Sequence, residues 1–134
     1  MLILNPKQVV FAGLSLDPVK SLVIERRATR LVVDHADTGP HVAFVDCPEV
    51  RVTMRVTQDL IDPLADSPRP GESGTITATV STSGSDAGRR SLSATGVVTQ
   101  VSYEVSPRVG ALRTLEFVLV SPTGANDPVT ITPI

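Results

Sequence analysis

The sequence predicts a mainly β protein, and three observations support that prediction. Strand-like runs rich in Val, Ile and Thr recur along the 134 residues, whereas helical periodicity is hard to find. Turn residues separate these runs at the spacing of hairpins. The apolar content of 41% comes mostly from aliphatic side chains, because the chain has three Phe, one Tyr and no Trp. We expect one domain, residues 1–134, folded as an antiparallel β-sandwich or half-open barrel with one short helix.

The expected elements follow in order along the chain. Residues 1–18 are expected to form an N-terminal arm ahead of the first long strand. A turn at 37–40 and the loop "SPRVGA" at 106–111 have the residues that hairpins need. The runs with strand character cover residues 19–36, 41–47, 49–58, 74–82, 91–106, 111–121 and 128–133.

One segment, "DLIDPLADSPRPGESG" at 59–74, breaks this pattern. Its three prolines allow no more than one helical turn, which Asp59 would cap. Long excursions of this kind in compact domains are usually functional or disordered. Its apolar residues Leu60, Ile61 and Leu64 must be buried against something, and a neighbouring chain is one option.

The strand "EVRVTMRVTQ" at 49–58 has two unlike faces. Val50, Val52, Met54 and Val56 fall on the side that a core would take. The opposite side carries a row with two arginines, which faces water, a partner chain, a nucleic acid or a channel. The nearby run "ERRATR" adds three more arginines, and residue counts favour a solvated face with acids close by.

Charge and composition argue against several classes of protein. The net charge is −2, from 12 basic and 14 acidic residues, whereas proteins that grip a DNA backbone usually carry a basic excess. The scarcity of aromatic side chains argues against platforms for single-stranded nucleic acid or sugar. No secretory leader and no apolar run of membrane-spanning length is expected, so synthesis and folding in a cytoplasm are predicted.

No catalytic constellation stands out, and we predict neither an enzyme nor a bound cofactor. There is no G-x-S-x-G elbow and no phosphate-binding loop with its lysine. Cys47 is expected to be a small buried or half-buried side chain, or a candidate for an interchain disulfide outside a reducing cell. The candidate metal ligands have no recognised spacing, and a polar turn explains them better: His35, Asp37, His41, Asp46 and Cys47.

The order of the runs resembles that of the tail tube proteins of tailed bacteriophages, especially the small tubes inside contractile tails. The resemblance begins near Lys20, with "ERRATRLVVDHADTGPHVAFVDCPEVRVTMRVTQ" followed by the proline-rich excursion. Its most specific part is the C-terminal half, in which "GVVTQVSYEVS", a short turn and "LRTLEFVLVS" precede the closing "TGANDPVTI".

This resemblance implies a structural subunit that forms hexameric rings, which stack into a hollow tube inside the virion tail. Inner strands of the subunits would join into one β-barrel around a channel, through which DNA passes without sequence-specific binding. The N-terminal segment and loops would join successive rings. Implied partners are further copies of the chain and the tail sheath, baseplate and tape-measure proteins, with assembly in the host cytoplasm. Alternatives are a baseplate tube initiator or secretion-system tube protein, or a small β-barrel that binds sugar or lipid.

Within such a tube, specific residues become candidates for contacts between subunits. Unpaired arginines facing the channel would retain DNA, so Arg51 and Arg55 are expected to pair with acids across subunits or to face the outer or inter-ring surface. The segment 59–74 is expected to make the main ring-to-ring contact through its apolar residues. The candidate partner acids are Glu49, Asp59, Asp62 and Glu104.

Overall fold

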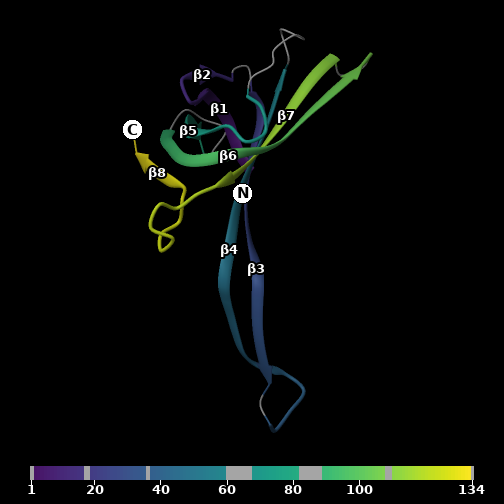
Figure 1. Cartoon of the computed structure of the whole chain (residues 1–134), viewed down its shortest axis with the longest axis vertical. Helices are drawn as coiled ribbons and strands as arrows, with labels where there is room; N and C mark the ends of the chain where they lie inside the picture. Colours follow the sequence, from purple (N-terminus) through teal and green to yellow (C-terminus); the bar gives the residue numbers. More distant parts are fainter. Residues whose placement is uncertain are drawn as a thin grey trace.

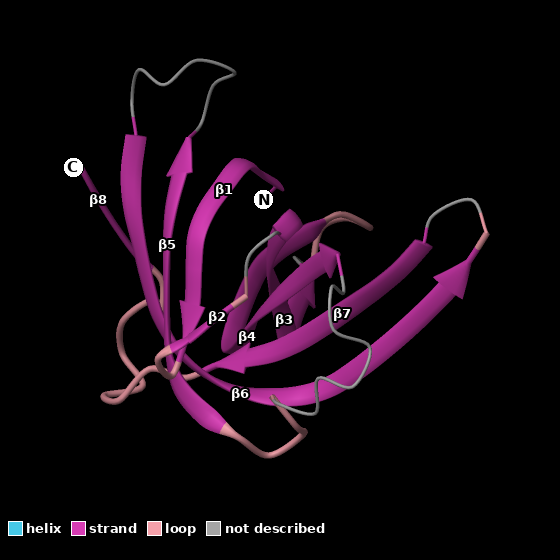
Figure 2. Cartoon of the chain, turned by 90° about the horizontal axis from the view of Figure 1, so that it is seen from above, coloured by secondary structure: helices cyan, strands magenta, loops and turns pink. Residues whose placement is uncertain are grey.

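Eight antiparallel strands form one curved sheet in the structure, a computed structural model (Figure 1, Figure 2). The structure describes residues 2–16, 19–35, 37–59, 68–81, 89–107 and 110–133. The strands are β1 (Leu2–Phe11), β2 (Leu14–Ser15), β3 (Val19–His35), β4 (Val42–Asp59), β5 (Ser73–Ser81), β6 (Arg89–Ser106), β7 (Gly110–Leu119) and β8 (Thr130–Pro133). The mainly β, antiparallel prediction is confirmed, and the described residues contain no helix.

The strand order explains the curvature of the sheet. It runs β2-β1-β3-β4-β7-β6-β5, with β8 beside β6, and β1 pairs in addition with β5 at the far end of the path. β1 makes both contacts by starting beside β3, where Leu2 lies opposite Val23, and ending beside β5, where Phe11 lies opposite Ile76. The sheet therefore curls round on itself (Figure 2).

The inner face holds the hydrophobic core. Alternate residues of the strands point inward, and the Phe11 and Phe117 rings meet with centroids 5.1 Å apart and planes tilted by 59°. Apart from these rings, the core is aliphatic, as the composition predicts. Its members are Val9, Phe11, Leu16, Leu22, Ile24, Val52, Met54, Val56, Ile76, Ala78, Val80, Leu92, Ala94, Val98, Leu115, Phe117 and Leu119.

The segment expected as an N-terminal arm is part of this sheet over its described residues, 2–16. In the sheet, β1 pairs with β2 and with β5, and Val9, Phe11 and Leu16 are buried. The register of β1 against β5 shifts twice, between Leu4 and Lys7 and again before Val10. Such irregularities interrupt the period of two that identifies a strand in a sequence, which explains why this strand was not predicted.

β4 is one continuous strand, although Pro48 suggested a break between two runs. The pairing with β3 shifts between the Arg30–Glu49 and Val32–Asp46 pairs, so that β4 has one extra residue in the stretch that contains Pro48. A bulge is one of the few places where a sheet accepts proline, because the missing N–H costs no ladder hydrogen bond there.

The excursion expected at 59–74 is shorter at both ends. Asp59 still belongs to β4, and β5 already begins at Ser73. Residues 68–72 form the described part of the connection, in which Gly71 has φ 96°. The predicted helical turn and the candidate contact residues Leu60, Ile61, Asp62 and Leu64 lie outside the described residues.

The β3–β4 hairpin extends far beyond the rest of the sheet (Figure 1). The described residues from Glu25 to Arg51, which include the turn at 37–40, are all exposed. Val50 was expected on the core side of its strand, yet it is 58% exposed, because Val52 is the last residue of β4 toward the hairpin tip that is buried in the core. The hairpin is thus a separate projecting feature, and among the described residues only a loop near the C-terminus contacts it, at its root.

Gly74 lies where β5 approaches the β1–β2 turn, and we expect its replacement by alanine to destabilise the fold. A Cβ at Gly74 would lie 2.7 Å from the Cβ of Ala12, whose φ of 50° already places it in a tight turn. Because neither backbone can move freely, Gly74→Ala should lower the free energy of unfolding by about 1–3 kcal/mol in chemical denaturation. Gly39→Ala is the control, since nothing lies within 4 Å of its Cβ position. Equal stability of the two variants would contradict the expectation.

Candidate functional site

A continuous polar surface covers the outer side of the four central strands. Residues that lie directly opposite one another in β3, β4, β7 and β6 point to the same side, and this side alternates with the buried one. We call this surface the polar face. Its polar members include Glu25, Arg27, Arg51, Thr53, Arg55, Thr57, Gln100, Ser102, Thr114 and Glu116.

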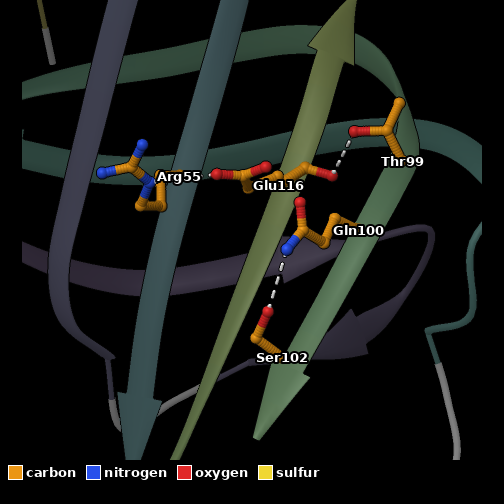
Figure 3. Close-up of polar contacts among 5 residues, drawn as sticks. All are labelled: Arg55, Thr99, Gln100, Ser102 and Glu116. Carbon is orange, nitrogen blue, oxygen red and sulfur yellow. Dashed lines mark hydrogen bonds and ion pairs between the residues drawn. The ribbon is translucent and has the colours of Figure 1, made fainter.

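Arg55 has its carboxylate partner on the neighbouring strand of its own chain (Figure 3). Its Nε lies 3.3 Å from Oε1 of Glu116, which is directly opposite in the β4–β7 register. The Thr99 hydroxyl donates to the Glu116 backbone carbonyl over 3.3 Å, and Gln100 Nε2 donates to Ser102 Oγ over 3.2 Å. Glu116 was not among the acids proposed from the sequence, because its register with Arg55 depends on how two distant strands pair.

Arg51 has a different environment from Arg55. It lies directly opposite Arg27 where the hairpin leaves the body, and neither arginine has an ion-pair partner among the described residues. Like charges directly opposite each other in a sheet are destabilising. The two side chains line a hollow of about 520 Å³ that also borders Glu25, Arg55 and Glu116. We call Arg27 and Arg51 the arginine pair.

The other candidate acids proposed for subunit contacts lie apart from this hollow. Asp59 forms an exposed ion pair with Lys20, with Nζ and Oδ1 3.4 Å apart. Glu49 is exposed in the hairpin, where its backbone carbonyl accepts a 3.5 Å hydrogen bond from the Thr29 hydroxyl. Glu104 is exposed on β6, opposite Leu112 of β7.

Cys47 and the histidines form no metal site among the described residues, and the interchain disulfide considered for Cys47 stays a prediction. Cys47 is exposed on the hairpin, which corrects the expectation of a buried or half-buried thiol. Over the described ranges, no three His, Cys, Asp or Glu side chains come together as metal ligands. A separate search of those residues for a helix long and apolar enough to cross a membrane finds none.

Two strand edges of the polar face lack partners in the described part of the chain. β1 pairs with β3 only at Leu22 and Val23, so residues 25–35 have no further strand on the outer side of β3 among the described residues. β5 pairs with β6 as far as Val97, and residues 71–72 bond to Val98, so residues 99–102 and 104–105 have no described strand on the outer side of β6. We call these stretches the β3 edge and the β6 edge. They belong to the two outer strands of this four-stranded group and lie toward its opposite ends, because the register carries Gln100 of β6 across Glu116 and Arg55 to Val23 of β3.

A loop near the C-terminus is fastened to the root of the hairpin by Asp127. The Val129 backbone N–H donates to Oδ1 of Asp127 over 2.9 Å, and Arg26 Nε lies 2.8 Å from Oδ2. The hydrogen bond from Val129 is the largest influence that holds the pKa of Asp127 below its usual value of 3.8. Burial is the next largest influence and raises this pKa, while the hydrogen bond and the charge of Arg26 lower it.

Acidification should therefore release this loop from Arg26. A carboxyl group with a lowered pKa contributes stability above the unfolded-state value, and that contribution is lost as the pH falls from about 3.8 through the folded-state pKa. Amide hydrogen exchange at Val129 should accelerate in this range beyond its intrinsic pH dependence. Asp127→Asn should show faster exchange already at neutral pH, with no further change on acidification. The same acid response in both proteins would contradict the assignment.

Comparison of the chain with protein-family models, with curated proteins and with solved structures finds no match in any of the three.

Proposed function

We propose that this chain is the structural subunit of a bacteriophage tail tube, in which hexameric rings stack into a hollow conduit for DNA. The observation that supports the proposal best is the pair of open edges on opposite sides of one four-stranded sheet. Long unpaired edges are an aggregation hazard for a monomer, and pairing between copies removes that hazard.

The strand directions suit a ring. Successive strands β3, β4, β7 and β6 are all antiparallel, so the β6 edge of one copy can pair antiparallel with the β3 edge of the next. Repetition of this contact around a closed circle joins the four strands of every copy into one ring-wide barrel. The finer features of the proposal, namely the half-open subunit and the hexameric ring, rest on this pairing.

Around Arg55 the polar face suits the lining of a channel through which DNA moves, whereas Arg27 and Arg51 would need counter-charges from another copy to fit such a lining. Hydroxyl and amide side chains are wetted without binding a polyanion tightly, and Glu116 neutralises Arg55 in every copy. A surface with a strong basic excess would hold phosphates by counterion release, and the net charge of −2 gives the chain as a whole no such excess. In this scheme the sheath, baseplate and tape-measure proteins would be the other partners, within the virion tail.

Two alternatives differ in how they would behave. A baseplate tube initiator or a secretion-system tube protein would form the same rings, with limited or different stacking. A small ligand-binding β domain is favoured by the hollow of about 520 Å³, which has the size of a small-molecule site. Its walls carry three arginines and two glutamates, unlike the mostly apolar lining that such sites usually have.

Negative-stain electron microscopy of the purified protein, with size-exclusion chromatography, tests the proposal. Hollow rods or stacked rings are the expected result. Isolated rings that do not stack would favour the initiator. A protein that remains monomeric at high concentration, even when preformed tail baseplates are added as initiators, would overturn the proposal, and a screen of anionic small molecules would then test the ligand-binding alternative.

A further inference from the structure

The outer part of the β3–β4 hairpin has two faces of different chemistry. On one face Val33 lies opposite Val45, His35 lies opposite Val42, and Leu31 precedes them on β3. The four aliphatic side chains of this face are between 42% and 58% exposed. A two-stranded ribbon is marginally stable by itself in water, so apolar exposure on this scale indicates that the hairpin packs against a partner.

The opposite face combines two acids with two apolar side chains. Asp46 lies opposite Val32, and Asp34 lies opposite Phe44, so the two carboxylates sit on a diagonal of this four-residue patch. Phe44 is 56% exposed, and neither aspartate has an ion-pair partner among the described residues. We call these four residues the aspartate patch.

The aspartate patch and the arginine pair are complementary in number and sign of charge. Each has two like charges on adjacent strands, and none of the four side chains has an ion-pair partner among the described residues. They cannot meet within one molecule, because even the five steps from Asp46 to Arg51 along β4 span about 17 Å of extended strand, which is more than the two side chains can bridge. Their mutual neutralisation therefore requires two molecules.

We propose that the aspartate patch of one copy docks into the hollow at the arginine pair of another copy. Two guanidinium groups would then meet two carboxylates, and Phe44 and Val32 would be withdrawn from water. Donor and acceptor surfaces are different parts of the chain, so the contact can repeat from copy to copy. The inference rests on the proposed tube, in which this contact would join successive rings. It places the ring-to-ring contact on the hairpin instead of on segment 59–74.

Charge exchange tests this contact in the full-length protein. One variant carries Arg27→Asp with Arg51→Asp, and a second carries Asp34→Arg with Asp46→Arg. Sedimentation velocity over a salt series should show that each variant alone associates about a hundredfold or more weakly than the wild type, because like charges now face each other. An equimolar mixture should regain association, since each variant then offers the complement of the other.

Controls separate docking from folding and from general charge. Each variant should keep the circular dichroism spectrum of the wild type, because all four positions are exposed. Lys7→Asp, a reversal at an exposed residue of β1, should associate like the wild type. If one of the two double variants fails to fold, a quadruple variant that carries all four substitutions replaces it in the test. This quadruple variant should fold and associate like the wild type. Failure of association to return in both the mixture and the quadruple variant would overturn the inference.

The outcomes distinguish the contact from the tube. If the variants form normal stacked tubes, the docking inference is wrong while the tube stands. If the mixture regains association that stops at dimers, the docking contact stands and the tube does not. If the wild type does not self-associate, but binds duplex DNA through the arginine pair without any effect of the aspartate exchange, the hollow recognises a polyanion and the inference is overturned.

Discussion

Val105→Pro is expected to weaken ring assembly strongly while leaving a folded subunit. Val98 makes its backbone hydrogen bonds to Gly71 and Glu72, so its N–H and C=O point away from β7. The alternation of the β6–β7 ladder then directs the N–H of Val105 outward as well, along the β6 edge. Proline removes that donor without breaking a bond inside the subunit, and its ring obstructs an incoming strand.

The measurement is the protein concentration at which rings appear, by light scattering and electron microscopy. We expect at least about a tenfold rise, because the lost hydrogen bond and the steric obstruction recur at every subunit interface of the ring. The free energy of unfolding of the subunit should change by no more than about 1 kcal/mol, since Val105 is 82% exposed. Val105→Thr keeps the N–H and should assemble normally. Rings formed by Val105→Pro at the wild-type concentration would contradict the proposed edge pairing.

Gln58→Leu is expected to lower the free energy of unfolding by about 3 kcal/mol, or to lower Tm by roughly 10 °C. Gln58 and Arg113 are the buried polar pair of β4 and β7, 5% and 3% exposed. The Gln58 Oε1 accepts from Arg113 Nε over 3.2 Å and from Nη2 over 3.0 Å, while its Nε2 donates to the Leu16 carbonyl over 3.1 Å. Leucine would remove the acceptor from a buried guanidinium and the donor from a backbone carbonyl.

A second substitution identifies the cause of that loss. Gln58→Leu combined with Arg113→Met removes the buried charge together with its acceptor, and matched apolar replacement of a buried polar pair is often close to neutral. The double variant should therefore recover part of the stability measured by chemical denaturation. If it is less stable than Gln58→Leu alone, then Arg113 does not depend on Gln58, and the cost of Gln58→Leu comes from packing.

The register of β4 against β7 is what the sequence could not predict about the candidate site. Alternation along 49–58 correctly places Arg51 and Arg55 on the other face of the strand from Met54 and its buried neighbours, because a period of two depends only on local geometry. The pairing of Arg55 with Glu116 joins residues 61 positions apart, and no local pattern specifies it.

The same distinction holds for the arginine pair. Arg27 lies directly opposite Arg51 because the β3–β4 pairing contains several register shifts. The alternation of apolar and polar residues does not reveal where such shifts occur, so it could not predict this pair. The hollow beside them requires β7 to lie next to β4, although residues 60–109 separate these two strands along the chain. The extent of the β3–β4 projection is likewise set by where the other strands stop.

By itself, the sequence determined the mainly β class, the positions of most strands and the division of the 49–58 strand into an apolar and a polar side. These follow from side-chain alternation and turn chemistry, which act over a few residues. Only the tertiary structure decided that the N-terminal segment is a core strand, which acid neutralises Arg55, and which edges and hairpin faces remain open. Those properties depend on pairing between distant strands, where the register is chosen by the burial of the whole sheet and not by any one segment.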